Sequence, residues 1–336
     1  MDEITLYKLK FNAPLHIGAH GVGYEETGNM IHSDTLFSAI LSLWRNFYEE
    51  DIESICKAPP FIISSAFPFK KDMLFFPRPM ARIGKEAENN DQKEKKLKRV
   101  EFISQQLLES ILKGKSGNLE FNEEDTFQNG KFWHPNRSSL NKNNEIVFAE
   151  RELPRVAIDR NTNSSDIFYF SEIVFEKDSG LFFLARFIEN GIKQKFEAVL
   201  RLLGDEGIGG DKRMGKGLFS LDIQEDFHIL FPENADGFLT LSLYYPQESE
   251  FNGGIRNDAS YNLISRKGWL HAPGAMTLRR KEIRTFTEGS VFNTTGKEIY
   301  GTNPCVLGKN ENLGLMHNIY RYGIAFNLPM VRGKQK

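Results

Sequence analysis

The sequence has little cysteine and no long apolar run. Cys56 and Cys305 are its two cysteines, and their separation matches no metal-binding spacing and provides no disulfide framework. No segment approaches the roughly 20 apolar residues that a membrane-spanning helix requires, and the opening residues MDEITLYKLK are too polar for a signal peptide. These absences predict a cytoplasmic protein with no metal, no cofactor and no membrane partner.

The sequence also lacks an excess of charge of one sign. Its 43 basic and 45 acidic residues give a formal net charge of -2. This balance does not exclude a polyanionic partner, because basic residues can gather on one face. The apolar share of 40% and the 28 phenylalanines are typical of a globular protein. The 336 residues allow one large domain or two ordinary ones.

Apolar periodicity predicts the element order of a ferredoxin-like unit in residues 1–227. The stretch 4–11 alternates as a strand does. From Ser33, apolar residues at helical spacing predict a helix with Ser33 or Asp34 as its N-cap. A β-hairpin is predicted over 167–176 and 181–188, joined by the turn KDSG. A helix over 193–204, which Gly204 stops, and a strand over 217–224 follow it. This order, β-α-β-β-α-β, is that of the ferredoxin-like fold.

A segment from about 50 to 165 interrupts this order, and we interpret it as an insertion. It contains the charged run EAENNDQKEKKLKR, typical of a solvated helix face, with a phosphate-binding patch as the alternative. One helix is predicted from an apolar stripe at Leu97, Val100, Ile103, Leu107 and Ile111. In the same segment, Phe132, Trp133 and His134 would either stack on a base or anchor a loop.

The remaining residues, 237–336, follow a linker over 228–236 and are strand-rich, without a clear helix. They predict a second, degenerate ferredoxin-like unit. The predicted fold class is therefore α+β, with tandem ferredoxin-like (RRM-like) βαββαβ units, of which the first carries the large insertion.

The stretch GDEGIGGDKRMGKGLF, residues 204–219, is a glycine-rich loop with basic side chains. Its part 210–217 nearly matches the phosphate loop G-x-x-x-x-G-K-[ST]. However, Gly217 stands where the magnesium-binding hydroxyl belongs, and a helix precedes the loop where a strand should. A nucleotide-binding enzyme is therefore excluded. Glycines flanked by cations can instead follow the phosphates of an irregular polyanion; a flexible loop tip with solvated charges is the alternative.

Three further stretches resemble known proteins. A glycine-rich loop in this position of a ferredoxin-like unit resembles that of the RAMP superfamily of CRISPR-associated proteins. LHIGAHGVGYEETGNMIHSDTLFSAILSLW (15–44) resembles the N-terminal signature of the fourth Csm subunits of type III-A effector complexes. PRVAIDRNTNSSDIFYF (154–170) is similar to the R-x-x-I-D-R-x-T segment of RAMP backbone and cap subunits, and EGSVF (288–292) to the C-terminal signature of the family.

This resemblance implies a non-catalytic subunit of a hetero-oligomeric Csm complex. Subunits of this family hold the repeat-derived 5′ tag of the guide RNA (crRNA), and through it meet the target RNA. They also bridge the large polymerase-like subunit and the backbone RAMP subunits. We therefore expect crRNA, the large subunit and the backbone RAMP subunit as partners.

The resemblance also implies a set of RNA-binding residues, because a single-stranded tag needs cations and amides for its phosphates. They lie in the N-terminal signature, the start of the hairpin, the glycine-rich loop and a basic segment. In that order they are His16, Gly18, His32 and Ser33; Arg155, Asp159 and Arg160; Gly207, Gly209, Gly210, Lys212, Arg213, Gly215 and Lys216; and Arg279, Arg280, Lys281 and Arg284. Asp159 is as well suited to cap a turn, and the basic segment could be a solvated edge strand or face the large subunit.

His32 carries the alternative function. RAMP relatives that process guide RNA use a histidine of the N-terminal unit as general base for attack by a 2′-hydroxyl, without metal. His32, just before the first predicted helix, is the candidate for that role. His16, His20 and His32 would also be possible zinc ligands, but no cysteine or carboxylate completes a convincing set.

Overall fold

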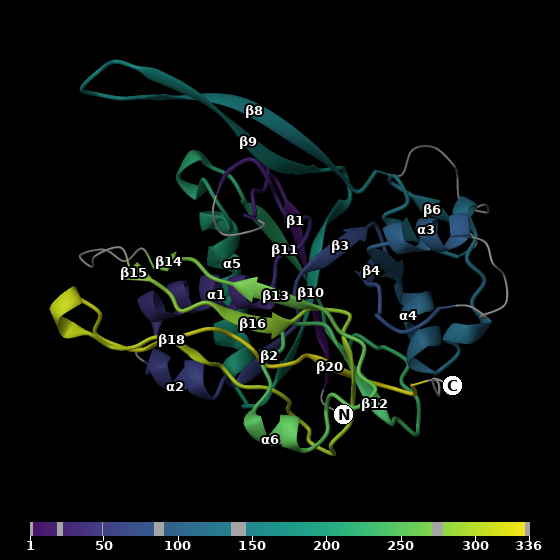
Figure 1. Cartoon of the computed structure of the whole chain (residues 1–336). Helices are drawn as coiled ribbons and strands as arrows, with labels where there is room; N and C mark the ends of the chain where they lie inside the picture. Colours follow the sequence, from purple (N-terminus) through teal and green to yellow (C-terminus); the bar gives the residue numbers. More distant parts are fainter. Residues whose placement is uncertain are drawn as a thin grey trace.

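Strands dominate the part of the chain that the computed structural model describes, residues 3–18, 23–48, 50–83, 91–135, 146–270 and 278–332 (Figure 1). The long helices there are α1 (Ser33–Phe47) and α5 (Ile192–Glu206), and the shorter ones are α2 (Ile52–Lys57), α3 (Asp91–Arg99), α4 (Gln105–Leu112) and α6 (Glu248–Asn252). This mixed composition confirms the α+β class. Within those ranges, no helix is long and apolar enough to cross a membrane.

The largest sheet is built mainly from the first two thirds of the chain. Its order is β11-β1-β10-β3-β4-β5-β7-β6, and β2 also pairs with β10. The strands are β1 (Thr5–Phe11), β2 (Phe61–Ile63), β3 (Phe67–Lys70), β4 (Met73–Pro77), β5 (Phe102–Ser104), β6 (Thr126–Phe127), β7 (Phe132–Trp133), β10 (Ser179–Phe187) and β11 (Phe219–Gln224). Residues 61–77, which the sequence assigned to an insertion, thus supply three strands of this sheet.

The two long helices pack beside each other through the apolar stripes that predicted them. In α1, Leu36, Ile40 and Trp44 are fully buried. In α5, Phe196 packs edge-on against Phe61, with ring centroids 4.7 Å apart. Burial of an amphipathic face supplies most of the stability of such helices, which is why periodicity was enough to find them.

The predicted N-cap of α1 is wrong. His32 occupies the N-cap, and Ser33 and Asp34 are the first helical residues. Neither side chain turns back onto the free N–H groups of the helix. The Ser33 hydroxyl accepts a hydrogen bond from the Leu243 amide at 3.0 Å, and the Asp34 carboxylate binds Arg266.

The predicted β-hairpin over 167–176 and 181–188 is also wrong. β9 (Ser165–Phe175) pairs along its whole length with β8 (Phe148–Ile158), whereas β10 pairs with β1, β2 and β3. The turn KDSG therefore joins two sheets. Residues 181–185 of β10 are fully buried, so this strand needs sheet partners on both sides, which β9 alone would not supply.

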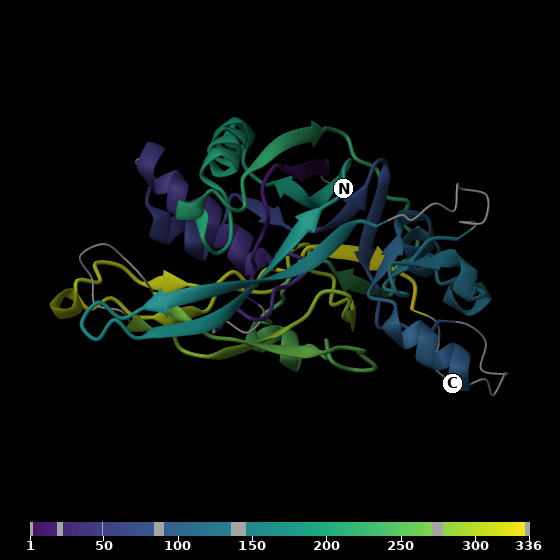
Figure 2. The same cartoon turned by 90° about the horizontal axis from the view of Figure 1, so that it is seen from above.

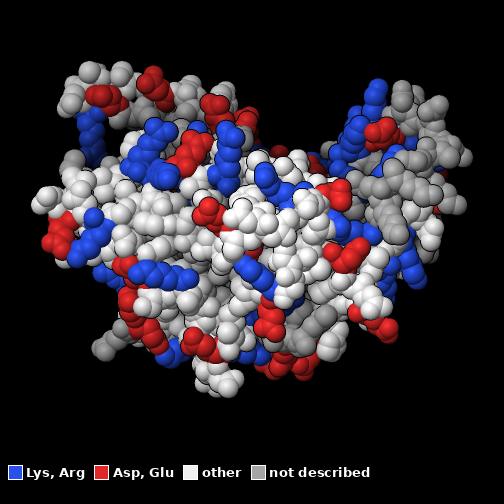
Figure 3. Space-filling view, turned by 60° about the horizontal axis from the view of Figure 1, so that its bottom comes forward, with Lys and Arg blue, Asp and Glu red and all other residues white. Residues whose placement is uncertain are grey.

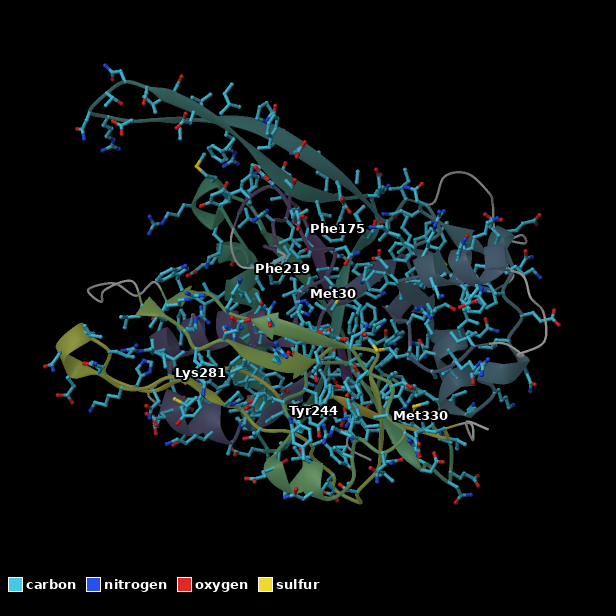
Figure 4. The ribbon with its side chains drawn as sticks, viewed as in Figure 1. Met30, Phe175, Phe219, Tyr244, Lys281 and Met330 are labelled. Carbon is cyan, nitrogen blue, oxygen red and sulfur yellow. The ribbon has the colours of Figure 1, made fainter. Side chains whose placement is uncertain are left out.

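The β8–β9 hairpin projects far from the body of the molecule in Figure 1, whereas in Figure 2, seen from above, it overlaps the rest of the chain. Its base is fixed by aromatic packing on the large sheet. Phe175 of β9 stacks on Phe11 of β1 with ring centroids 5.0 Å apart, and Phe219 of β11 lies 5.6 Å from the same ring (Figure 4). The hairpin is thus a rigidly rooted arm with an exposed outer half.

The predicted single helix over 97–111 is interrupted. Helix α3 ends at Arg99, the residues Phe102–Ser104 form β5, and α4 begins at Gln105. Phe102 and Ile103 are buried because β5 lies between β4 and β7. Tertiary pairing therefore overrides the helical spacing of the apolar residues.

The C-terminal part consists of short strands. Its sheets are one of order β17-β12-β20 and the pairs β13-β16, β14-β15 and β18-β19. The strands are β12 (Gly237–Thr240), β13 (Leu263–Arg266), β14 (Trp269–Leu270), β15 (Leu278–Arg279), β16 (Ile283–Phe286), β17 (Val291–Asn293), β18 (Cys305–Leu307), β19 (Ile319–Tyr320) and β20 (Asn327–Met330). Leu239, Tyr322 and Phe326 belong to the same buried cluster as α1 and α5, and a second cluster around Tyr244 and Phe292 lies within the C-terminal part.

Candidate nucleic-acid interface

Charge is mixed on one face of the molecule. On the face that Figure 3 shows, Lys and Arg side chains alternate with Asp and Glu. An interface for a polyanion therefore has to be sought where particular cations are exposed and have no acidic partner.

The glycine-rich loop connects α5 with β11. The prediction that Gly204 stops the helix is wrong, since α5 continues to Glu206 and ends at Gly207, whose φ is +81°. Gly204 is a close-packing position instead. A Cβ there would overlap the carbonyl oxygen of Phe219 on β11, so glycine lets the helix approach the strand.

Most glycines of this loop serve its own packing. A Cβ on Gly209 would overlap the main-chain oxygen of His16, and one on Gly207 that of Lys216. The Gly210 amide donates to the His16 carbonyl at 2.9 Å, and the Gly215 amide donates to the Lys212 carbonyl at 2.9 Å. These backbone groups hold the loop against the segment after β1, and they are not free to bind phosphate.

The tip of the loop is different in character. Residues Lys212–Met214 form a single 3-10 turn, and the flanking Asp211 and Gly215 are both left-handed. Lys212 and Arg213 are exposed, and neither makes an ion pair with a residue in the described part of the chain. A tightly built loop therefore presents two unpaired cations at its outermost point.

Lys216 points inward. Its ammonium forms an ion pair with the fully buried Glu172 of β9 and lies 4.6 Å from the centre of the Phe170 ring. Burial, with Arg155 and Arg151 nearby, lowers the pKa of Lys216. This lysine joins the loop to the hairpin, and we leave it out of the proposed RNA contacts.

Arg155 completes the junction between loop and hairpin. Its guanidinium lies 4.0 Å from the centre of the Phe170 ring and pairs with Asp211 at the start of the loop tip. The same face of the hairpin carries Arg151, which also binds Glu172. Arg155 is half-buried, so its outer edge remains accessible beside Lys212 and Arg213.

The tip of the hairpin contains Asp159 and Arg160, two of the predicted RNA-binding residues. Asp159 caps the turn, because its carboxylate accepts from the Asn161 amide at 2.8 Å and the Thr162 amide at 2.9 Å. These hydrogen bonds lower the pKa of Asp159. Asp159 therefore does not hold Arg155, while Arg160 is exposed at the end of the hairpin.

The opposite face of the hairpin is apolar, which the sequence analysis missed. Val156 lies opposite Ile167, and Pro154 opposite Tyr169. Val156, Ile167 and Tyr169 are all exposed, together with Ile158. The large apolar residues at every second position of PRVAI were the available signal. Large exposed apolar side chains on a projecting ribbon are typical of a binding surface.

The N-terminal histidines occupy separate places. His16 is buried, its Nδ1 lies 2.7 Å from the Ser171 carbonyl and its ring packs on Phe170, whereas Gly18 is exposed. His20 lies outside the described residues. Within the described ranges, no group of three or more His, Cys, Asp or Glu side chains is placed to hold a metal ion.

His32 is held by a buried carboxylate. Its Nδ1 lies 2.9 Å from Oε1 of Glu288, which also accepts a hydrogen bond from Ser65. Burial by itself would raise the pKa of Glu288, but the charge and hydrogen bond of His32 and the Ser65 hydroxyl hold it below its usual value. Ser33, next along the chain, is fully buried, so we also leave it out of the proposed RNA contacts.

The basic segment of the C-terminal part divides by exposure. Arg279, Lys281 and Arg284 are exposed, whereas Arg280 donates from Nη2 to the Trp269 carbonyl at 3.0 Å and is largely buried. Trp133 is buried and packs against Phe121, so it anchors the loop around it.

Comparison with known proteins identifies related chains along almost the full length. Residues 8–220 match the model of the RAMP superfamily, and residues 233–330 match that of the CRISPR Csm4 C-terminal domain. A protein of Thermococcus onnurineus named CRISPR system Cms protein Csm4 is 27% identical over 88% of this chain and 90% of its own. One of the same name from Methanocaldococcus jannaschii is 25% identical over 97% of each chain.

Solved structures share the fold. A chain in the crystal structure of a Csm3-Csm4 subcomplex of the type III-A CRISPR-Cas interference complex aligns with a TM-score of 0.65 at 18% identity, over 98% of this chain and 99% of its own. A chain in the crystal structure of a Csm1-Csm4 cassette in complex with cA4 aligns with a TM-score of 0.61 at 20% identity, over 99% of this chain and 100% of its own.

Proposed function

Because the chain belongs to the RAMP superfamily and carries a Csm4 C-terminal domain, we propose that it is a non-catalytic RNA-binding subunit of a type III-A interference complex. In this role it holds the 5′ repeat-derived tag of the crRNA and, through the crRNA, meets target RNA. It also bridges a large polymerase-like Csm1 subunit and backbone RAMP subunits of the Csm3 kind, because the solved relatives are found with those two proteins.

The observation that carries this proposal is the loop tip with its unpaired cations. Lys212 and Arg213 stand at the end of a loop that close glycine packing and the Lys216–Glu172 ion pair brace against the β8–β9 hairpin. A braced cation costs less to immobilise on a phosphate than a cation on a flexible chain. Arg160, exposed at the end of the hairpin, adds a further cation, whereas the charge of Arg155 is balanced by Asp211.

The topology supports a ferredoxin-like origin for the N-terminal part. Taken with α1 and α5, the strands β1, β3, β10 and β11 follow the chain order β-α-β-β-α-β, and they lie in the sheet as β11-β1-β10-β3. If these four strands are numbered 1 to 4 along the chain, their order across the sheet is 4-1-3-2. We propose that the C-terminal part is a second, degenerate unit of the same origin, which has lost its long helices.

Replacing both Lys212 and Arg213 by alanine is expected to weaken binding to single-stranded RNA and to flatten its salt dependence. Each phosphate contact contributes about 0.7 to the slope of log K against log salt, so the slope should fall by about 1.4. Fluorescence anisotropy with a labelled oligoribonucleotide over a series of salt concentrations measures this slope.

The matched control is alanine at both Lys93 and Lys95, which are exposed cations on α3 without an ion pair to a residue that the structure describes. This control removes the same charge and should leave the slope unchanged. An equal fall in both variants would mean that RNA responds only to net charge, and that the loop makes no specific contact.

One observation favours a second candidate function, a metal-independent endoribonuclease that processes guide RNA. The imidazole of His32 is held from Nδ1 by the buried carboxylate of Glu288. A carboxylate behind an imidazole orients the other ring nitrogen as a general base.

Incubation of the pure protein with a repeat-containing transcript separates the two functions. As a binding subunit, the chain should leave the transcript intact at any protein concentration, and gel electrophoresis should detect no product. Site-specific cleavage that His32→Ala abolishes would establish the ribonuclease and overturn the non-catalytic role.

A further inference from the structure

A second group of residues on the C-terminal part has the chemistry of a site for a nucleobase. It centres on Trp269 in the short β14–β15 hairpin, outside the glycine-rich loop. The inference rests on the proposed function, because it concerns the same RNA.

Trp269 is the exposed tryptophan of the chain. The other two, Trp44 and Trp133, are 0% and 1% exposed, whereas Trp269 is 47% exposed. Half of a large apolar ring left in water costs free energy that burial would recover. A solvent-facing indole in a strand pair of only two residues a side contributes little to folding, so its role is better sought in binding.

Cations flank this indole. Arg279 lies directly opposite Trp269 across the strand pair, where two side chains stand on the same face about 5 Å apart. Lys267, two residues before Trp269, and Lys281, two residues after Arg279, are also exposed. Between Arg266 and Arg284, the described positions include one acid, Glu282.

At the base of the β14–β15 hairpin, the single carboxylate of Asp34 faces three arginines, so the net charge there is positive. Asp34 accepts two hydrogen bonds from Arg266 and one from Arg321. Arg280 lies in the same field, and its Nε is buried without a partner among the described residues. Burial first, and then the charges of Arg321 and Arg266, lower the pKa of Arg280. Such a cluster attracts an anion to its open side.

Space for a ligand exists next to Arg279 and Lys281, although Trp269 is not among the residues that line it. An open hollow of about 520 Å³ is lined by residues 279–282 of one strand segment and 305–308 of β18 and its end. Its wall includes the apolar Val306 and Leu307, and the Lys281 amide donates to the Val306 carbonyl at 2.7 Å. Figure 4 labels Lys281 on the left of the molecule, the side on which Figure 1 places β14 and β15.

The position fits a continuous RNA path. In Figure 1, the β14–β15 hairpin lies on the same side of the molecule as the glycine-rich loop after α5 and the free end of the β8–β9 hairpin. The three elements thus lie on one side of the molecule, as binding of a single RNA strand by all of them would require.

We propose that Trp269 stacks on one unpaired base of the bound RNA while Arg279 and Lys281 contact the phosphates on either side of it. An aromatic ring between cations is the usual way in which proteins bind single-stranded nucleic acid without reading its sequence. The charge of the surroundings favours RNA over a protein partner, because the apolar patches that bind proteins are depleted of lysine.

The test uses the full chain labelled with 5-fluorotryptophan and observed by fluorine NMR, in which each of the three tryptophans gives one signal. Trp269→Phe assigns the signal of interest. Titration with oligo(A) should shift or broaden the Trp269 signal and leave those of Trp44 and Trp133 unchanged. Inorganic polyphosphate, which offers charge without bases, should leave all three unchanged.

Affinity measurements complete the test. Trp269→Ala is expected to weaken oligo(A) binding by about 5- to 160-fold, with the salt slope unchanged, because stacking contributes about 1–3 kcal/mol per base and displaces no counterion. Trp269→Tyr should restore most of the affinity. Arg279→Ala, in contrast, should lower the slope by about 0.7.

The outcomes separate this inference from the proposed function. Wild-type affinity in Trp269→Ala, with binding still lost on replacement of Lys212 and Arg213, overturns the stacking and leaves the function intact. Lost co-purification of a partner subunit at unchanged RNA affinity would make Trp269 a protein contact and also overturn the proposal. No oligo(A) binding by the wild-type chain, alone or in its complex, would remove the function and the inference together.

Discussion

Asp34→Asn is expected to lower the free energy of unfolding by about 3–5 kcal/mol, the range for breaking a buried ion pair from one side. Asp34 is almost completely buried at the start of α1. Its carboxylate accepts from Arg266 at 2.9 and 2.8 Å and also from Arg321. Both arginines come from the C-terminal part, so the substitution would leave two buried cations without a carboxylate where the two parts meet.

The effect should depend on pH. Burial by itself would raise the pKa of Asp34, but Arg266 and Arg321 outweigh it and hold the pKa well below the usual value. A carboxyl with a lowered pKa in the folded state stabilises the protein above its unfolded pKa of about 3.9, and this contribution is lost as the pH falls through the folded pKa. The deficit of Asp34→Asn relative to wild type should thus be constant near neutral pH and shrink below about pH 4.

Urea denaturation over a pH series measures both effects. The matched control is Asp222→Asn, because Asp222 pairs with Lys10 at 2.7 Å with both side chains about half exposed. Such a surface pair contributes about 1 kcal/mol at most. A deficit for Asp34→Asn no larger than that of the control would show that the arginines do not depend on Asp34.

Glu172→Gln is expected to lower the free energy of unfolding by about 3 kcal/mol. Glu172 is fully buried at the base of the β8–β9 hairpin, where it binds both Lys216 and Arg151. Arg151 is half exposed and can be hydrated, but the Lys216 side chain is only 10% exposed. The unpaired ammonium therefore accounts for most of the expected loss.

A double-mutant cycle checks this attribution. Lys216→Met removes the buried ammonium, so adding it to Glu172→Gln should recover at least about 1 kcal/mol. Glu152→Gln, an exposed position on β8, is the control and should change stability by less than about 0.5 kcal/mol. If the effects of Glu172→Gln and Lys216→Met simply added, the pair would contribute nothing and the loop would be braced by its glycines alone.

Local patterns predicted the elements better than their partners. The stripe from Leu36 to Trp44 predicted α1 because one face of a helix must be buried wherever the helix lies. The turn KDSG was also found, yet turn chemistry does not say which strands pair across it. The partner of β9 is β8, a strand that the sequence placed in an insertion, and β2 and β3 have only three and four residues, too few to show a period.

In the candidate site, too, local sequence predicted the element but not the contacts of its side chains. Glycine and charge content correctly indicated a loop between a helix and a strand, with basic side chains. Which cations are free depends on distant residues: Glu172 takes Lys216, and Asp211 takes Arg155. Trp269 gave no sequence signal, because exposure of a single aromatic residue depends on the packing of the whole C-terminal part.

The most direct test of the account is the RNA retained by the assembled complex. The chain is co-expressed with its neighbouring Csm subunits and a guide-RNA locus, the complex is purified, and the 5′ ends of the extracted RNA are sequenced for wild type and for the variant with alanine at Lys212 and Arg213. The account predicts guide RNAs with a common repeat-derived 5′ end in the wild type, and a clear loss of that RNA from a variant complex whose subunits still assemble. Equal amounts of the same RNA in both, or in a complex that lacks this chain, would contradict it.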